Sequence, residues 1–335
     1  MGRRTSREDK SLAGLGTGMH PSALSQAERL ENTMSHVPFH FIPRSLFKYV
    51  TADTALKVLT NKTLMWRSPD SFNDPFEFRS PFEFGFELEQ LEEPFLQRVS
   101  ILMTLQDDPD LFEDNPVANM IREARAQRMG GGDPAKIQEL LRPRFPQYVN
   151  HLKPGLESDR KIWLEMKKTY RVLCLSAVRD NILMWSHYAD EHRGAILEFQ
   201  PKIELATEML GALEVEYSKE VRVAVTLEQF LLYITGQGPK PHSPNALVKS
   251  AFTKSSDWSY ENEWRILNKQ RDEDQGSFSY RAFHPQELAA IYFGCRMSDS
   301  YKDNIRAAVS DWKSQICFFQ MRLERIRYEL AADPV

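Results

Sequence analysis

Cysteine is scarce in this sequence, and the few cysteines are far apart. Only three occur in 335 residues, Cys174, Cys295 and Cys317, and none belongs to a C-x-x-C pair. Zinc sites and disulfide frameworks need several cysteines at defined spacings, so neither is indicated here. Sparse, unpaired cysteines are typical of proteins in a reducing compartment, and we expect a cytoplasmic location.

Long apolar runs are also lacking. No stretch reaches the ~20 apolar residues that a membrane-spanning helix needs, and the opening MGRRTSREDK lacks the apolar core of a secretory signal. The formal net charge is -4, which gives no general attraction to nucleic acid or to an anionic membrane. We therefore expect no membrane partner. A local basic group leaves nucleic acid open as a partner: Lys153, Arg160, Lys161, Lys167 and Lys168.

Familiar catalytic loops are absent as well. The chain has no G-x-G-x-x-G and no G-x-x-x-x-G-K-[ST] loop, so the common dinucleotide-binding and P-loop folds are not indicated. Ser176 does not lie in the G-x-S-x-G context of a hydrolase nucleophile. Cys174 lies in an apolar run, where we expect it to be buried and unreactive.

The distribution of apolar residues indicates one large folded region. They make up 41% of the chain, which is enough to bury a core. Residues 1–37 are polar and without periodicity, and we expect them to be a disordered tail. Residues 38–330 are expected to form a single α+β domain, with a helical insertion at about 86–170. Because strands are not separated by regular helical crossovers, the pattern predicts a mixed, mostly antiparallel sheet.

Individual elements follow from periodicity and capping residues. Thr51 or Asp53 is expected to cap one helix, and Asp180 or Asn181 another. The expected strands are 46–50, 64–67, 171–176, 194–199, 212–218, 221–225, 263–267, 278–283, 288–294 and 316–323. Further helices are expected at 226–234, 245–255 and 299–313.

The stretch KSSDWSYENEWRIL, which begins at Lys254, carries the first candidate site. If it is extended, Glu261, Glu263 and Arg265 share one face, since side chains alternate along a strand. Two adjacent carboxylates repel each other, which raises one pKa and requires a nearby cation such as Arg265 or Lys254. The alternative is an edge strand with solvated charges, although Trp258 and a second tryptophan imply burial nearby.

The stretch SPDSFNDPFEF, over 68–78, is a second candidate. It places Asn73 and Asp74 between phenylalanines. These two residues either face a pocket while the aromatic rings anchor the loop, or they form a turn and do nothing else, since Asn-Asp-Pro is common turn chemistry.

A third candidate is the helix expected within DNILMWSHYADEHRG. Met184 and Tyr188 can face the core, while Trp185 and His187 fall on other faces. A neutral histidine such as His187 can hydrogen-bond a ligand or act as a base. His187 and His192 have no third ligand nearby and suit a metal only loosely. The alternative is that the histidines are satisfied by the backbone and the aromatic residues serve packing.

Several stretches together carry a resemblance to a known family. LFKYV, SPDSFNDPFEF, LCLSAVRDNILMWSHYADEHRGAILEF, VEYS, KSSDWSYENEWRIL and IYFG occur in this order between about Leu46 and Gly294. The series resembles a bacterial family known as domain of unknown function 2971. Relatives often have arginine where this chain has Val50. This resemblance does not by itself imply an activity.

A more distant resemblance concerns LFKYVTADTALKVLTNKTLMW, which looks like the opening of ADP-ribosyltransferase-type domains. It implies an α+β fold with a split, mostly antiparallel sheet, and NAD as the substrate. It also implies a polar residue on the first strand, a serine or aromatic residue on a middle strand and a glutamate on a late strand. The residues at these places, in order, are Lys48 and Tyr49, then Ser176, then Glu263 or Glu261. The usual first-strand histidine or arginine and the serine-threonine-serine run are missing.

Three hypotheses about function follow. The first is an intracellular bacterial enzyme that transfers ADP-ribose from NAD to a protein or nucleic acid, as a toxin or as a phage-defence effector with a phage-derived trigger. Its catalytic carboxylate is Glu263, which stabilises an oxocarbenium-like transition state. The second is a nucleotide- or nucleic-acid-processing enzyme in which Asp74, His187 and the two glutamates hold a divalent metal. The third is a non-enzymatic sensor that binds a small ligand or a phage protein.

These hypotheses draw on one set of candidate residues. The catalytic candidates are Glu263, Glu261 and His187. The candidates for substrate or cofactor binding are Lys48, Tyr49, Asn73, Asp74, Ser176, Trp185, Tyr188, His192, Lys254, Trp258 and Arg265.

Overall fold

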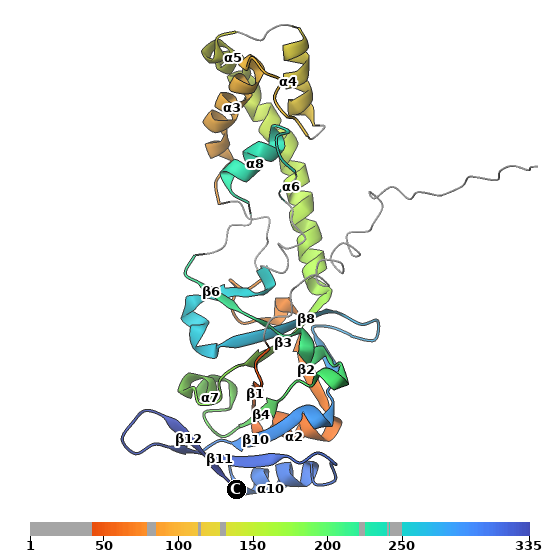
Figure 1. The fold of residues 1–335 in the computed structure, drawn as a ribbon, viewed down its shortest axis with the longest axis vertical. Helices are drawn as coiled ribbons and strands as arrows, with labels where there is room; N and C mark the ends of the chain where they lie inside the picture. Colours follow the sequence, from red (N-terminus) through yellow and green to blue (C-terminus); the bar gives the residue numbers. More distant parts are fainter. Residues whose placement is uncertain are drawn as a thin grey trace, which may run out of the picture. The chain divides into compact units, whose positions relative to one another are not determined.

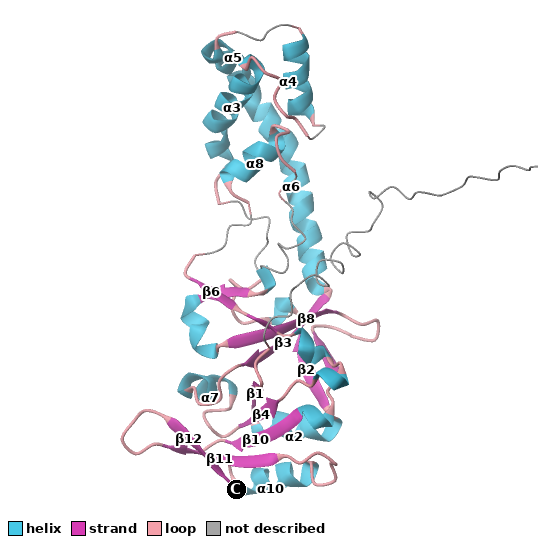
Figure 2. Cartoon of the chain, viewed as in Figure 1, coloured by secondary structure: helices cyan, strands magenta, loops and turns pink. Residues whose placement is uncertain are grey.

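The computed structural model describes residues 42–78, 85–112, 115–127, 132–220, 225–239, 241 and 250–335. The tail expected over 1–37 lies outside the described residues, and so does most of the strand expected at 221–225. The described part is a mixed α+β structure with a mostly antiparallel, open sheet (Figures 1 and 2). None of the described helices is both long and apolar enough to cross a membrane.

The main sheet follows the order β12-β11-β10-β4-β1-β3-β2-β9, and β8 pairs with β3 and β5 outside this path. β10 and β11 run parallel, and the other pairs of this sheet run antiparallel. Its strands are β1 (Leu46–Val50), β2 (Thr63–Arg67), β3 (Tyr170–Ser176), β4 (Ala195–Phe199), β5 (Leu213–Glu214), β8 (Glu263–Lys269), β9 (Phe278–Ala282), β10 (Leu288–Phe293), β11 (Cys317–Leu323) and β12 (Leu330–Pro334). A separate parallel pair consists of β6 (Glu216–Ser218) and β7 (Thr253–Ser255).

The first β-α-β segment forms as its sequence predicts. LFKYV is β1, and α2 (Ala52–Asn61) begins after Thr51, whose side chain accepts a hydrogen bond from the backbone N–H of Thr54. This cap satisfies one of the free N–H groups at the start of the helix. Lys62 ends the helix in the left-handed region and leads into β2. One face of α2 is buried through Ala55, Val58 and Leu59.

The pairing around β3 opens a gap in the sheet. Along one edge, β3 pairs with β8 from Tyr170 to Ser176. Along its other edge, β3 meets β2 at Val172, opposite Arg67, and meets β1 at Ser176, opposite Phe47. β1 and β2 therefore diverge from each other, and the middle of β3 lies between their two points of contact.

Two apolar cores lie against the sheet. The first includes α2, α10 (Asp299–Ala308) and the strand residues Leu173, Leu175, Trp264 and Ile266. The second includes residues of α7 (Ile182–Tyr188) and the strand residues Phe47, Tyr49, Ile196 and Tyr292. Since Trp264 and Ile266 belong to the first core, Glu263 and Arg265 point to the opposite face of β8, as strand alternation predicts.

A third apolar core is built by helices. Between β2 and β3 the chain forms α3 (Glu92–Thr104), α4 (Pro116–Ala126), α5 (Pro134–Leu141) and α6 (Phe145–Lys168). Asn115 and Asp133 cap α4 and α5, and each is followed by proline at the first helical position, where the missing N–H costs nothing. These helices share a core with α8 (Leu227–Ile234), which comes later in the chain.

The strand expected at 263–267 is confirmed as β8, but the residues before it are not extended. Residues Ser256–Glu261 form a short 3-10 helix, and Asn262 has a left-handed backbone, so the strand begins only at Glu263. The helix expected at 245–255 falls partly outside the described residues; residues 250 and 251 are helical, as expected, and the last three residues form β7 instead. The expected helix therefore ends earlier than predicted, because residues 253–255 pair with β6.

Other boundaries differ in smaller ways. The strand expected at 212–218 is divided into β5 and β6, and the helix expected at 299–313 ends at Ala308. β12 was not expected, because its sequence has little β propensity and ends in proline; it pairs antiparallel with β11.

Candidate functional site

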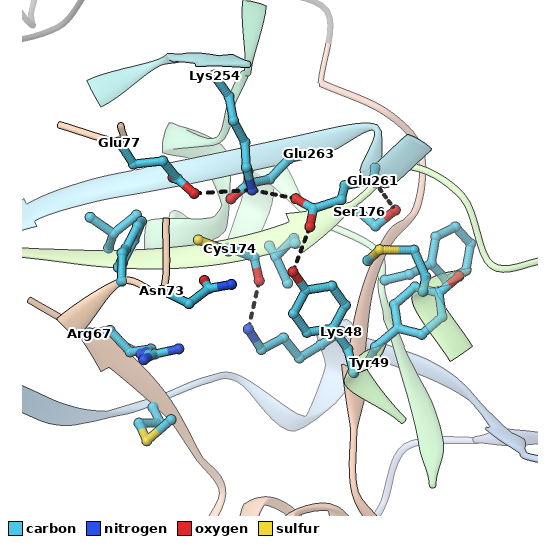
Figure 3. Close-up of a pocket in the computed structure, with 17 residues that line it drawn as sticks. Lys48, Tyr49, Arg67, Asn73, Glu77, Cys174, Ser176, Lys254, Glu261 and Glu263 are labelled. Atoms are coloured by element: carbon cyan, nitrogen blue, oxygen red, sulfur yellow. Dashed lines mark hydrogen bonds and ion pairs between the residues drawn. The ribbon is translucent and has the colours of Figure 1, made fainter. Parts of the chain in front are cut away.

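The gap between β1 and β2 contains a cavity of about 140 Å³ (Figure 3). Its walls come from β1, β2, β3, α7 and the segment from Lys254 to Glu263. The carbonyl oxygen of Cys174, in the middle of β3, accepts a hydrogen bond from Lys48 Nζ at 2.7 Å. A side chain therefore satisfies a backbone acceptor where the divergence of β1 and β2 leaves β3 without a neighbouring strand on that side.

One wall of the cavity holds three buried carboxylates around one ammonium group. Lys254 Nζ lies 2.5 Å from an oxygen of Glu261, 3.1 Å from Glu263 and 3.3 Å from Glu77. Burial opposes the charge on Lys254, but the three carboxylates outweigh it and raise the pKa of its ammonium group. Figure 3 shows Lys254 reaching between these three side chains.

Arg265 is the second cation of this group. Its Nε and Nη2 donate to the two oxygens of Glu263, each at 2.8 Å, and Nη2 also contacts Glu77. Its guanidinium lies 5.5 Å from the ring centre of Phe72 and 5.6 Å from that of Phe78. Arg265 is only 1% exposed. This agrees with the expectation that a cation balances the paired glutamates, and the alternative of a solvated edge strand is wrong.

Two of the carboxylates, Glu77 and Glu263, have pKa values shifted in opposite directions. Burial opposes ionisation of Glu263, but the charge and hydrogen bonds of Arg265, with the charge of Lys254, lower its pKa to about 2. Burial raises the pKa of Glu77, and Arg265 and Lys254 offset this only in part. Glu77 therefore takes up a proton more readily than Glu263.

Two further residues tie Glu261 to the cavity. Tyr188 donates its hydroxyl hydrogen to Glu261 Oε1 at 2.6 Å, and Ser176 Oγ donates to the Glu261 carbonyl oxygen at 2.6 Å. Burial and the bond to Glu261 raise the pKa of Tyr188, so its hydroxyl stays protonated. Glu261 thus has one oxygen on an ammonium group and the other on a phenol.

The opposite side of the cavity carries Lys48, from β1, and Arg67, from β2. Burial lowers the pKa of Lys48, and the like charge of Arg67 contributes to this. Arg67 donates to the carbonyl oxygen of Ser71, and its buried Nε has no hydrogen-bond partner. Asn73 also lines the cavity.

Most of the residues expected at the site are brought together. The cavity is lined by Lys48, Tyr49, Asn73, Ser176, Tyr188, Lys254, Glu261 and Glu263, and Arg265 lies directly behind Glu263. Tyr49 points its ring at Trp185 and donates to the carbonyl oxygen of Val178 at 2.9 Å. Its role is therefore to hold the wall in place.

The histidines and Trp185 do not line the cavity. His187 is exposed, with Nδ1 3.2 Å from the hydroxyl of Tyr260. His192 stacks on Trp185 and its Nε2 lies 3.2 Å from Ser186 Oγ. Trp185 is fully buried, contrary to its expected place away from the core. The expected assignment of helix faces was wrong for Trp185, because α7 is only two turns long and packs together with the turn that follows it.

Asp74 and Trp258 have structural roles. Asp74 Oδ1 accepts a hydrogen bond from the backbone N–H of Phe76 at 2.8 Å, which is the turn chemistry weighed for this loop. The Trp258 ring lies 5.0 Å from Lys254 Nζ and interacts with its charge. Trp258 therefore covers the ammonium group without lining the cavity.

Sequence reasoning missed two charged residues of the site. Glu77 belongs to the SFNDPFEF stretch, and Arg67 ends β2. The signal for Glu77 was a carboxylate placed between two phenylalanines, Phe76 and Phe78. Cys174 lines the cavity, although its apolar surroundings in the sequence predicted a buried position. Burial raises the pKa of its thiol and keeps it protonated, which agrees with the expected lack of reactivity.

The residues present do not fit the metal site of the second hypothesis. Asp74 and His187, two of its expected ligands, bond elsewhere, and Lys254 already lies among the three carboxylates. No group of three or more acidic, histidine or cysteine side chains within the described ranges has the geometry to hold a metal ion.

Comparison with known proteins places a family match on part of the chain. A family model described as "Protein of unknown function (DUF2971)" matches residues 184–266. This segment carries Tyr188, Lys254, Glu261, Glu263 and Arg265, so it contributes most of the acidic wall. No curated protein and no solved structure matches the chain. The match supports the family resemblance over this segment.

Proposed function

We propose that the cavity is the active site of an enzyme that transfers the ADP-ribosyl group of NAD. The observation that carries the proposal is the convergence of Glu261, Glu263, Ser176 and Tyr188 on one cavity. These residues come from three separate stretches of the chain, and Ser176 and one of the two glutamates occupy places implied by the ADP-ribosyltransferase resemblance. The acceptor is a protein or nucleic acid, and the role is that of a toxin or a phage-defence effector in the cytoplasm.

The chemistry of this transfer suits a carboxylate wall. The bond between the ribose and nicotinamide breaks, nicotinamide leaves with the electron pair, and an acceptor oxygen or nitrogen bonds to the ribose carbon and loses its proton. Positive charge develops on the ribose as the bond breaks. A fixed carboxylate stabilises that charge most strongly in a site with little water.

The geometry favours Glu261 over Glu263 as the carboxylate nearest to the sugar. Both oxygens of Glu263 are held by Arg265, and one of them also by Lys254. Glu261 is held by Lys254 and by the neutral hydroxyl of Tyr188. A carboxylate facing one cation keeps more negative charge for the reacting group than one facing two. Glu263 then keeps Arg265 and Lys254 in position.

The size of the cavity limits what enters it. Its volume of about 140 Å³ is close to that of a cavity of roughly 150 Å³ that holds benzene, and below the roughly 300–1,000 Å³ of pockets that enclose a whole ligand. One ring of a dinucleotide therefore fits inside, and the rest of the molecule lies at the mouth.

The test is release of nicotinamide from NAD, with and without protein and nucleic-acid acceptors. We expect the wild-type protein to release nicotinamide, Glu261→Gln to lose this activity and Glu263→Gln to be impaired. Glu198→Gln is the matched control, because Glu198 is a buried, hydrogen-bonded glutamate outside the cavity. If the wild type cleaves no NAD under any of these conditions, the proposal is wrong. Binding of NAD without cleavage would instead favour the sensor hypothesis.

A further inference from the structure

Lys48 and Arg67 are two cations of the cavity that make no ion pair with the described residues. Lys48 uses one of its three N–H donors on the carbonyl oxygen of Cys174. Arg67 uses one nitrogen on the carbonyl oxygen of Ser71, and its Nε is buried without a partner. The Asn73 side chain adds two donors that bond to no described residue.

The acidic wall does not provide the missing counter-charge by contact. Its three carboxylates are already within hydrogen-bond or ion-pair distance of Lys254 or Arg265. Lys48 and Arg67 also repel each other, which is one of the causes that lower the pKa of Lys48. Two neighbouring cations at a partly enclosed site are costly unless an anion binds between them.

We propose that Lys48, Arg67 and Asn73 form a subsite for a phosphoryl group. The three side chains come from β1, from β2 and from the loop after it, so they approach from different directions (Figure 3). This arrangement suits a tetrahedral group with three free oxygens better than a planar carboxylate with two. Arginine also matches phosphate oxygens with two N–H groups at once, while lysine adds a point charge.

The subsite deepens the proposed function, on which it rests for the identity of the ligand. It orients a nucleotide with a phosphate against Lys48 and Arg67 and the attached sugar against Glu261. The cavity then binds the phosphate of the ligand at its cationic side and the sugar at its acidic side. This predicts a sugar phosphate or nucleotide as the substrate class, and excludes a free base or nucleoside as a tight ligand.

The experiment measures binding of inorganic pyrophosphate, ADP-ribose and acetate to the full chain by calorimetry at fixed salt. We expect pyrophosphate and ADP-ribose to bind the wild type, and Lys48→Met and Arg67→Gln each to weaken both by about tenfold or more, the loss expected for a charge-assisted contact. Arg179→Gln, which removes an exposed cation outside the cavity, should bind as the wild type does. Thermal unfolding of each variant without ligand shows that it is folded.

Several results would overturn the subsite. They are no binding of pyrophosphate by the wild type, equal losses in Arg179→Gln and Lys48→Met, and acetate binding as tightly as pyrophosphate. NAD cleavage is scored separately. Phosphate binding that depends on Lys48, without any NAD cleavage, would support the subsite and contradict the proposed glycosyl transfer. NAD cleavage that persists in Lys48→Met with unchanged KM would support glycosyl transfer and contradict the subsite.

Discussion

Tyr188 donates its hydroxyl hydrogen to Glu261 across 2.6 Å and so joins α7 to the segment that precedes β8. The two residues are 73 positions apart in the chain, and both lie in the segment matched by the family model. Their bond closes one side of the cavity, beside Ser176. It also leaves Glu261 with a neutral partner on one oxygen, which is the basis of its proposed role.

The bond between Tyr188 and Glu261 should matter for activity more than for folding. We expect Tyr188→Phe to lower kcat for nicotinamide release by about tenfold or more, because a hydrogen bond to a charged group contributes about 1.5–3 kcal/mol. KM should change less. Tyr280→Phe, at an exposed tyrosine of β9, is the control and should leave both constants unchanged. Equal activity of Tyr188→Phe and wild type would remove this bond from the mechanism.

Lys254 should be the most sensitive residue of the acidic wall. Lys254→Met leaves three buried carboxylates without their shared ammonium group, and breaking a buried ion pair costs about 3–5 kcal/mol. We expect a loss of this size in the free energy of unfolding measured with urea. The comparison is Lys302→Met, whose partner Asp299 is exposed, where the loss should stay below about 1 kcal/mol. Similar losses in the two variants would show that the network does not stabilise the fold.

Ionisation of Glu263 should make the free energy of unfolding decrease at acidic pH. Its pKa is about 2 in the folded protein against an ordinary 4.5, so its contribution to stability is present above pH 4.5 and is lost as pH falls towards 2. Urea unfolding between these pH values should show a steeper loss in wild type than in Glu263→Gln. Glu165→Gln, at an exposed residue of α6, should follow the wild-type curve. Parallel curves for wild type and Glu263→Gln would contradict the lowered pKa.

The contribution of Glu77 to the free energy of unfolding should change with pH in the direction opposite to that of Glu263. Burial raises its pKa in the folded protein, so its contribution is complete below the ordinary pKa of 4.5 and is lost as pH rises through the folded value. Relative to wild type, Glu77→Gln should therefore gain stability as pH rises above 4.5. The same urea measurements, extended to pH 7, check this. A difference between the two proteins that does not vary with pH would mean that Glu77 titrates like an exposed carboxyl group.

The elements that the sequence predicted well are those with local causes. The strand at Leu46–Val50, the cap at Thr51 and the facing of Glu263 and Arg265 on β8 depend on neighbouring residues only. The cation required by the paired glutamates was also foreseeable, because two close carboxylates need one. Local patterns therefore located the acidic wall and one strand of the opposite wall.

The rest of the site depends on contacts between distant segments. Glu77 reaches Arg265 across 188 positions of sequence, and Arg67 enters the cavity only because β1 and β2 diverge along β3. No periodicity encodes either relationship. His187 misled for the opposite reason: it lies one residue from Tyr188, but the short helix turns its ring towards Tyr260 and away from the cavity.

The turn after α7 should tolerate no side chain at Gly194. Asp190, Glu191 and His192 all have left-handed backbones, and the turn packs so closely that a Cβ at Gly194 would lie 2.2 Å from the carbonyl oxygen of Val50. Backbone atoms cannot move aside cheaply, so we expect Gly194→Ala to lower the free energy of unfolding by about 2 kcal/mol or more. Gly155→Ala is the matched control: it lies within α6 with open space around it, so alanine should stabilise by about 0.5–1 kcal/mol. Urea unfolding of both variants gives the comparison.

Because α7 carries Tyr188, Gly194→Ala should also weaken NAD cleavage more than it weakens pyrophosphate binding. A Gly194→Ala variant as stable and as active as the wild type would show that the turn can open without cost.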